Sequence, residues 1–258
     1  MGRYILSFTK QGFSRYTSHL DLLRLFKRAF KRCGIPLAYS QGFNPHPKMS
    51  FSQPLSLGYL AKDEILEFQL DGEMATEEIL RRMRSAMPLG ITISYCKELD
   101  IKPKTLASIV EGAKYLVFYP SSWKEMNDNS SASPEDAISG YLAQTEIITK
   151  KRQKKTKAMV DVDIRNMISS IKVWSNDITD TTGLLDRPFV IEMNLNAGSD
   201  SNLSPELVIN TFNEFAGLNV KREDIEVERE FLYFKPCIPQ TLGLHLDYGE
   251  RIKDQMDE

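Results

Sequence analysis

The segment RYILSFTKQGFSRYTSHLDLLRLFKRAFKRCG, residues 3–34, decides the fold because it joins a strand pattern to a helix pattern. Its start, RYILSF, alternates in the way that is typical of a β-strand. From Ser18 to Cys33, apolar side chains recur at the i, i+3, i+4, i+7 spacing of an amphipathic α-helix, and Ser18 is its candidate N-cap. Gly34 and Pro36 follow and end the helix. The chain therefore begins with a strand and a helix.

The rest of the first hundred residues completes a known order of elements. EILEFQL from Glu64 and ITISYC from Ile91 alternate as strands, and TEEILRRMRSAM is typical of a helix with Thr76 as its N-cap. A turn-rich segment with short apolar flanks, residues 37–58, lies before them. The resulting order, β-α-β-β-α-β, is that of the split βαβ, or ferredoxin-like, unit, in which two helices cover one face of an antiparallel sheet.

The second half of the chain repeats this alternation with additions. KYLVFY from Lys114 and FVIEMNL predict strands, and IEVEREFLYF from Ile225 predicts a last strand. The segments that begin at Ser133 and Ser204 predict helices, the first with Ser133 as its N-cap. We therefore predict an α+β protein of two ferredoxin-like (split βαβ) units in tandem, the second elaborated. The predicted boundaries are an N-terminal domain at residues 1–100, a linker at 101–113, a C-terminal domain at 114–236 and a tail at 237–258.

Positive charge is concentrated at the start of the chain. Residues 1–60 contain nine Lys or Arg residues and a single acid, Asp21, which gives a net charge of +8. The whole chain carries −2, so the remaining residues carry −10. Because a concentrated cationic segment raises the local potential, this distribution favours an anionic partner.

Several classes of protein are disfavoured by what the sequence lacks. No apolar run approaches the roughly 18 residues of a membrane span, and the N-terminus has no signal-peptide pattern, so we expect a cytoplasmic protein without a membrane segment. Cys33, Cys96 and Cys237 are too widely spaced for a CxxC site or an iron–sulfur loop, and we expect buried free thiols, no metal and no cofactor. The absence of GxxxxGK[ST], GxGxxG, HExxH and GxSxG patterns disfavours a mononucleotide-driven or zinc enzyme.

The helix at residues 18–33 carries five cations on the face opposite its apolar stripe. They are Arg24, Lys27, Arg28, Lys31 and Arg32. Such a row is either a solvated surface or a surface for a polyanion, and like charges at i, i+4 are mildly destabilising without a counter-charge. Because the guanidinium fork suits phosphate, we predict anion binding by three of them, Arg24, Arg28 and Arg32.

The loop SQGFNPHPK, residues 40–48, is the second candidate. Gly42 permits unusual backbone angles, Asn44 favours a turn, and two prolines stiffen the chain. His46 and Lys48 add side-chain donors, and Tyr39 or Phe43 could stack on a base. The alternative is a merely structural turn. We predict Gly42, Asn44, His46 and Lys48 as further anion- or nucleic-acid-binding residues.

Two other features leave their interpretation open. His19 is either a partly buried structural histidine or a general acid or base, since imidazole changes charge near neutral pH. A second basic run places six cations in eight residues, and it is either a solvated hairpin or an extension of the first basic face. Its members are Lys150, Lys151, Arg152, Lys154, Lys155 and Lys157.

Residues 16–58 closely resemble the uncharacterised radical SAM-linked protein family. The resemblance is most specific in SHLDLLR and YSQGFNPHPK, and it extends more weakly to about Phe234. Members are fused to, or encoded beside, cobalamin-binding-type radical SAM proteins. The resemblance implies a stand-alone accessory subunit whose partner enzyme carries the cluster. It supplies no catalytic residues, so Ser18, His19 and Asp21 are candidates by motif membership and chemistry only. Lys27 departs from relatives, which often have an acid there.

We therefore expect an accessory protein without catalytic activity that presents an RNA, such as a transfer or ribosomal RNA, to a radical SAM enzyme. A second hypothesis is a metal-independent endoribonuclease, because tandem ferredoxin-like units also resemble, in architecture only, the repeat-associated CRISPR-processing (RAMP) type. His19 and His46 would then act as acid and base on a ribose 2′-hydroxyl. A third hypothesis is a protein-only docking subunit whose basic face binds an acidic patch on the radical SAM enzyme.

Overall fold

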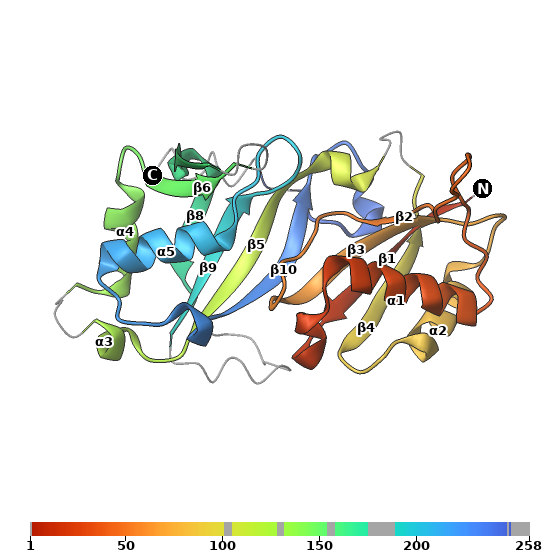
Figure 1. Ribbon diagram of the computed structural model, residues 1–258, viewed down its shortest axis with the longest axis horizontal. Coiled ribbons are helices and arrows are strands. Elements are labelled where there is room, and N and C mark those ends of the chain that lie inside the picture. The colour runs from red at the N-terminus through yellow and green to blue at the C-terminus, as the bar shows by residue number, and fades with distance from the viewer. Residues whose placement is uncertain are drawn as a thin grey trace. The chain divides into compact units, whose positions relative to one another are not determined.

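A computed structural model describes residues 2–100, 105–127, 132–153, 158–174, 189–246 and 248 (Figure 1). The chain divides into two units, one of residues 1–111 and 228–248 and the other of residues 112–227 and 249–258. Both units contain helices and strands, so the predicted α+β class is confirmed. The first boundary falls between residues 111 and 112, inside the predicted linker at 101–113. Residues 228–236, which we expected in the second domain, group with the first unit.

The first unit is built on three antiparallel strands with β1 in the middle. Tyr4 of β1 lies opposite Phe68 of β3 on one side and opposite Glu98 of β4 on the other. A short strand, β2, pairs antiparallel with the second half of β3, and β10 pairs parallel with the start of β3. The strands are β1 (Arg3–Lys10), β2 (Met49–Phe51), β3 (Leu60–Gln69), β4 (Ile91–Glu98) and β10 (Glu226–Phe234).

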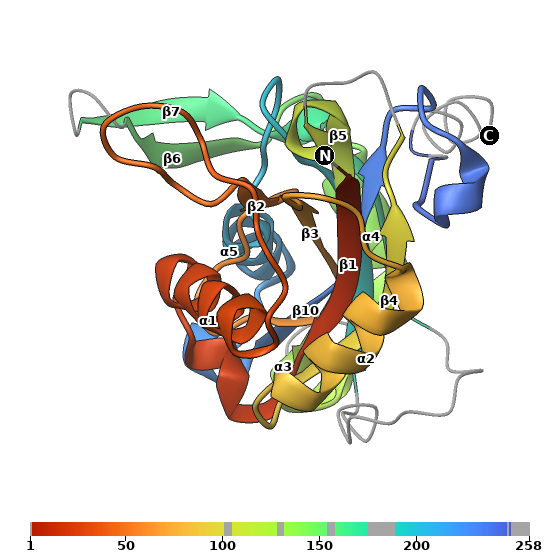
Figure 2. The same ribbon diagram turned by 90° about the vertical axis from the view of Figure 1, so that its right-hand side faces the viewer.

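Helices α1 (His19–Arg32) and α2 (Thr76–Ala86) cover one face of this sheet, as Figures 1 and 2 show. The predicted apolar stripe of α1 is buried in the core, where the Phe26 ring lies 4.9 Å from the Phe8 ring and the Phe30 ring lies 4.8 Å from the Phe68 ring. Each such side chain contributes roughly 1.5–3 kcal/mol by leaving water. Packing of this stripe forces the cations of α1 to the outer side.

The starts of the two helices test the predicted caps. The Ser18 side chain accepts a hydrogen bond from the Asp21 N–H at 3.2 Å, so Ser18 is the N-cap of α1 as predicted. The prediction for α2 was wrong by one residue. Ala75 is the N-cap, its carbonyl accepts from Glu78 and Ile79, and no side chain caps this end because Thr76 already lies in the first turn.

In the second unit, β9 pairs antiparallel with β5 on one side and with β8 on the other, and β6 and β7 form a separate two-stranded sheet. Helices α4 and α5 pack through the Tyr141 and Phe212 rings, 5.4 Å apart, and Ser133 caps α4 as predicted. The strands are β5 (Val110–Tyr119), β6 (Ile148–Arg152), β7 (Met159–Asp163), β8 (Ile168–Val173) and β9 (Phe189–Asn196). The helices are α3 (Trp123–Met126), α4 (Pro134–Leu142) and α5 (Pro205–Ala216).

Two further expectations concern the cysteines and the membrane. Cys96 is buried, but Cys33 is only half-buried and Cys237 is exposed, so the expectation that all three are buried was wrong for two of them. Cys237 lies beyond the end of β10, next to the exposed Pro236. Within the described parts of the chain, no helix has both the length and the apolar character that crossing a bilayer requires.

Candidate functional site

The outer side of α1 and the segment that follows it enclose a groove of about 810 Å³, which we call the basic groove. Four cations of α1 form one wall, and Tyr39, with 44% of its surface exposed, also lines the groove. None of the described residues that line the groove is acidic. The lining residues are Arg24, Lys27, Arg28, Phe30, Lys31, Gly34, Ile35, Pro36, Leu37 and Tyr39.

The end of α1 explains why a groove forms there. Gly34 adopts a φ of +63°, which reverses the chain, and the Ile35 N–H bonds back to the Phe30 carbonyl at 3.0 Å. The chain then returns beside the helix and is fixed to the sheet, because Leu37 bridges to Leu70 of the first unit. The segment after Gly34 thus forms a second wall of the groove.

Some cations of α1 form hydrogen bonds or ion pairs within the protein, and others do not. Arg24 pairs with Asp21 at 2.8 Å on the surface. Arg32, a predicted anion-binding residue, donates to the Ala86 carbonyl at 2.7 Å and does not line the basic groove, so it joins α1 to the end of α2 instead. Within the described parts of the chain, neither Lys27 nor Lys31 forms an ion pair or a hydrogen bond through its ammonium group. The basic groove therefore contains the predicted Arg24 and Arg28 together with Lys27 and Lys31, whose ammonium groups form no ion pair or hydrogen bond with the described residues.

The loop at residues 40–48 is closed by its own backbone. The Ser40 N–H donates to the His46 carbonyl at 2.8 Å, the His46 N–H donates to the Ser40 Oγ at 3.0 Å, and the Lys48 N–H donates to the Ala38 carbonyl at 2.8 Å. The N–H groups of His46 and Lys48 are therefore not available to an anion. The tip, residues 41–45, is exposed, with Gly42 at a φ of +124°.

His46 and Lys48 line a second cavity of about 330 Å³ with Ser40, Gln69 and Glu67. The Glu67 carboxylate pairs with Arg3 at 2.6 Å and accepts from the Leu106 N–H at 2.8 Å. This cavity thus has one cation and one buried carboxylate on its walls, and it is less suited to phosphate than the basic groove. Tyr39 and Ser40 are consecutive residues, so the two sites lie next to each other along the chain.

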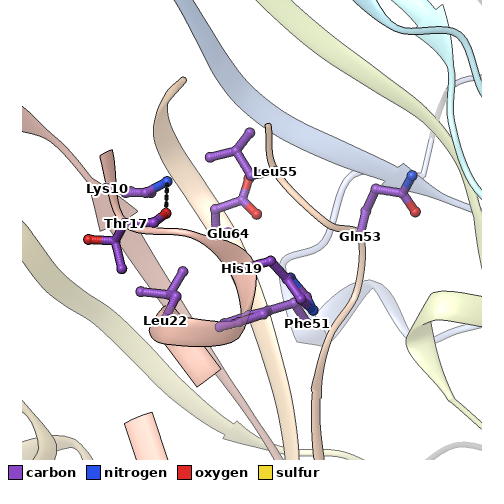
Figure 3. A pocket seen from close by; sticks show the side chains of 8 residues that line it. All are labelled: Lys10, Thr17, His19, Leu22, Phe51, Gln53, Leu55 and Glu64. Carbon is purple, nitrogen blue, oxygen red and sulfur yellow. Dashed lines mark hydrogen bonds between the residues drawn. The ribbon is translucent and has the colours of Figure 1, made fainter. Parts of the chain in front are cut away.

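His19 lies in a third place, a small pocket shown in Figure 3. Its ring packs edge-on against Phe51 at 5.4 Å, and burial lowers the pKa of His19 below its usual value. The pocket encloses about 10 Å³, which is room for about one water molecule. None of its lining residues lines the cavity of His46, so the structure does not bring the two predicted acid–base histidines into one site.

Sequence reasoning missed the buried charges beneath His19. The Lys10 Nζ donates to the Arg15 and Thr17 carbonyls at 3.1 Å each, and the dashed line in Figure 3 marks the second of these bonds. Burial lowers the pKa of Lys10, while the carboxylate of Glu64 opposes the shift. The signal available in the sequence was a charged residue in each of two strand patterns, Lys10 in β1 and Glu64 in β3, at positions that the structure buries. These charges position the segment that leads into α1.

The second basic run belongs to the second unit. Lys150, Lys151 and Arg152 lie on the exposed strand β6, where Lys150 is opposite Asp161 of β7. Lys154, Lys155 and Lys157 lie outside the described residues. A hairpin with exposed cations fits the solvated interpretation of the described half of this run.

A metal site is not formed by the described residues, since no three His, Cys, Asp or Glu side chains among them are grouped closely enough to hold an ion.

The chain belongs to a bacterial protein family. The family model, described as "Uncharacterized protein conserved in bacteria (DUF2344)", matches residues 3–205. No curated protein matches the chain. The family description names no activity and no partner, so the roles of the site residues follow from their geometry alone.

Proposed function

We propose that this member of the DUF2344 family is an accessory protein that binds RNA and presents it to a radical SAM enzyme. The observation that supports RNA binding is the basic groove, in which Arg24, Lys27, Arg28 and Lys31 form a wall with no described acidic residue in the lining. Phosphates that bind there release counterions, which favours association at low salt.

The energetics of α1 agree with a polyanionic ligand. Arg24 and Arg28, like Lys27 and Lys31, are like-charged pairs at i, i+4, and each pair costs the free helix roughly 0.2–0.5 kcal/mol. A bound phosphate backbone removes this repulsion. The repulsion is small compared with the burial of the apolar stripe, so α1 stays folded without a ligand and offers a preformed cationic wall.

The neighbouring aromatic and polar groups favour RNA with unpaired bases over a simple anion. Tyr39 exposes a ring at the groove, and base stacking on such a ring contributes about 1–3 kcal/mol. Next to it, Asn44, His46 and Lys48 offer donors to base edges or phosphates. Phosphates would lie on the wall of α1, and the nucleotide on which the partner enzyme acts would lie closer to the loop at residues 40–48.

The partnership with a radical SAM enzyme rests on the resemblance of residues 16–58 to radical SAM-linked proteins. In this arrangement the partner carries the cluster and performs the radical chemistry, and this chain holds the substrate.

We also interpret both units as ferredoxin-like. In the first unit, the antiparallel pairs β4–β1, β1–β3 and β3–β2 follow the order of a split βαβ unit, and the hairpin β6–β7 is an addition to the second.

The test is a titration of a fluorescein-labelled single-stranded RNA with the full-length protein, measured by fluorescence anisotropy at increasing salt. We expect the logarithm of the association constant to fall linearly with the logarithm of salt concentration, by about 0.7 for each phosphate contact. No binding at low salt, either to the protein alone or to its mixture with the partner enzyme, would contradict the proposal. Ribonuclease activity is not favoured, because His19 and His46 line separate cavities.

A further inference from the structure

Five large apolar side chains are exposed at one end of the first unit, and we call them the apolar patch. Their exposed fractions range from 61% to 101%. Contiguous exposed apolar patches are uncommon on monomeric proteins. They mark interaction sites more often than single exposed apolar residues do. The members are Phe13, Tyr16, Leu20, Leu57 and Leu89.

Backbone hydrogen bonds bring three distant segments together to form the apolar patch. The Gly58 N–H donates to the Arg15 carbonyl at 2.9 Å, which places Leu57 beside the 3-10 helix η1 (Gly12–Tyr16). On the other side, the Gln11 N–H donates to the Gly90 carbonyl at 2.8 Å, which places Leu89 beside the start of the same helix. Figures 1 and 2 show η1 as the short coil before α1, next to the turn that precedes β4.

The helix η1 presents its aromatic residues to solvent. A 3-10 helix has three residues per turn, so Phe13 and Tyr16 lie on the same side. No residue of η1 is buried, which means that this turn contributes nothing to the core. Leu20, in the first turn of α1, extends the same exposed surface and is 62% exposed. Phe13 and Tyr16 therefore expose most of their surface to solvent.

The apolar patch is held in a fixed geometry. The Lys10 ammonium bonds to the Arg15 and Thr17 carbonyls, which fixes the chain at the end of η1. At the other end the backbones are in close contact, since a Cβ on Gly90 would lie 2.6 Å from the Gln11 carbonyl oxygen. A surface that is ordered before binding loses little conformational entropy when a partner docks.

The geometry points to a docking site for an acidic, amphipathic segment of a partner protein. Three cations lie on the same two helices as members of the apolar patch. The Arg15 guanidinium lies 5.3 Å from the centre of the Tyr16 ring, and Arg24 and Lys27 follow Leu20 by one and two turns of α1. The exposed acid in this stretch, Asp21, is already paired with Arg24. Apolar side chains of the partner would cover the patch, and its carboxylates would meet these cations.

Charge also decides against a second copy of this chain as the occupant. A symmetric dimer through the apolar patch would bring the same cations together from both copies, and like charges at an interface cost affinity. None of the five apolar side chains lines the basic groove, so the apolar contacts of this docking site are separate from the proposed RNA-binding surface, whereas Arg24 and Lys27 belong to both.

The experiment is a selection of random peptides of about 16 residues, displayed on phage, against the full-length protein. The double variant Phe13→Ser/Leu89→Ser is used to remove peptides that bind elsewhere. We expect the recovered peptides to be acidic and to carry apolar residues at i, i+3 and i+4. A synthetic peptide of the recovered sequence should bind the wild type and lose at least about fivefold in affinity with Phe13→Ser or, separately, Tyr16→Ser.

Phe43→Ser is the matched control, because Phe43 is a fully exposed phenylalanine outside the apolar patch and its replacement should leave peptide affinity unchanged. All of these variants should unfold at the wild-type urea concentration, since the replaced side chains are exposed. The inference is overturned if no peptide prefers the wild type over the double variant, or if the recovered peptides are neutral or basic. It is also overturned if Phe13→Ser converts a dimer to a monomer in sedimentation, or abolishes binding to anionic phospholipid vesicles.

Discussion

The Arg229 guanidinium donates two hydrogen bonds to the Glu64 carboxylate, from Nε at 2.6 Å and from Nη2 at 2.5 Å, and both side chains are buried. Arg229 also donates to the Gln53 and Pro54 carbonyls, at 2.9 and 3.2 Å. The pair joins β10 to β3 across 165 residues of sequence, and it fixes the chain between β2 and β3. Residues 228–248 are thereby tied to the first unit.

Removing the Arg229 side chain should be strongly destabilising. In Arg229→Leu, the Glu64 carboxylate stays buried without its partner, and the free energy of unfolding should fall by about 3–5 kcal/mol. Arg229→Lys should recover only part of this loss, because an ammonium cannot form the bidentate contact. Urea unfolding measures both values. A loss below about 1 kcal/mol for Arg229→Leu would show that the pair does not hold β10 in place.

Glu228, next to Arg229, should make stability depend on pH. Burial raises the pKa of Glu228 from 4.5 to about 7, and the nearby ammonium of Lys62, at 3.3 Å, is shared with Glu230 at 2.6 Å. The folded state therefore holds the Glu228 proton more tightly than the unfolded state does. Stability from this group is present below about pH 4.5 and is lost as pH rises through about 7, by at most about 3 kcal/mol.

Glu228→Gln removes this titration while keeping the shape of the side chain. The variant should be more stable than the wild type at pH 8, and the difference should shrink toward pH 5, as measured by urea unfolding at both values. Parallel profiles for the two proteins would show that Glu228 is not the group responsible.

Ser18→Ala tests the start of α1. The hydrogen bond from the Asp21 N–H to the Ser18 Oγ would be lost, at a cost of about 1 kcal/mol. The pKa of Asp21 should rise toward its usual value, because the hydrogen bond from Ser18 is the main cause of its lowering. Ser204→Ala is the control, since Ser204 is the N-cap of α5 but its side chain makes no capping bond. Equal losses in the two variants would contradict this assignment.

Lys48 and His46 test the loop at residues 40–48. If Lys48 contacts a phosphate, Lys48→Ala should weaken RNA binding and reduce the salt dependence by about one unit. His46→Ala should weaken binding with a smaller change in salt dependence, because it removes a hydrogen-bond donor rather than the ammonium of a lysine. Lys124→Ala, at an exposed lysine of α3, should have no effect on either quantity. Unchanged binding in both loop variants would confine the site to the basic groove.

The sequence predicted what depends on local pattern. The apolar spacing in residues 18–33 and the Ser18 cap predicted α1, and the alternation in EILEFQL predicted β3, because periodicity and capping act within a few residues. The contacts of distant residues were not predictable in this way. The pairing of Arg229 with Glu64 depends on the register of β10 beside β3, which no local pattern specifies.

The candidate site shows the same limit. The cations of α1 were visible in the sequence, but the contact of Arg32 with Ala86 depends on how α1 packs on α2. The second wall of the basic groove depends on the reversal at Gly34 and the bridge from Leu37 to Leu70. The apolar patch was not anticipated, because its residues come from three segments that only the folded backbone brings together.

The most direct test of RNA binding in the basic groove compares two double variants with the same net charge. Lys27→Glu/Lys31→Glu reverses the charge of two lysines that line the groove, and Lys124→Glu/Lys221→Glu reverses the charge of two exposed lysines elsewhere. Measured by anisotropy at low salt, RNA affinity should fall at least about tenfold for the groove variant and less than about twofold for the control. Equal losses in both, or none in the groove variant, would contradict the account.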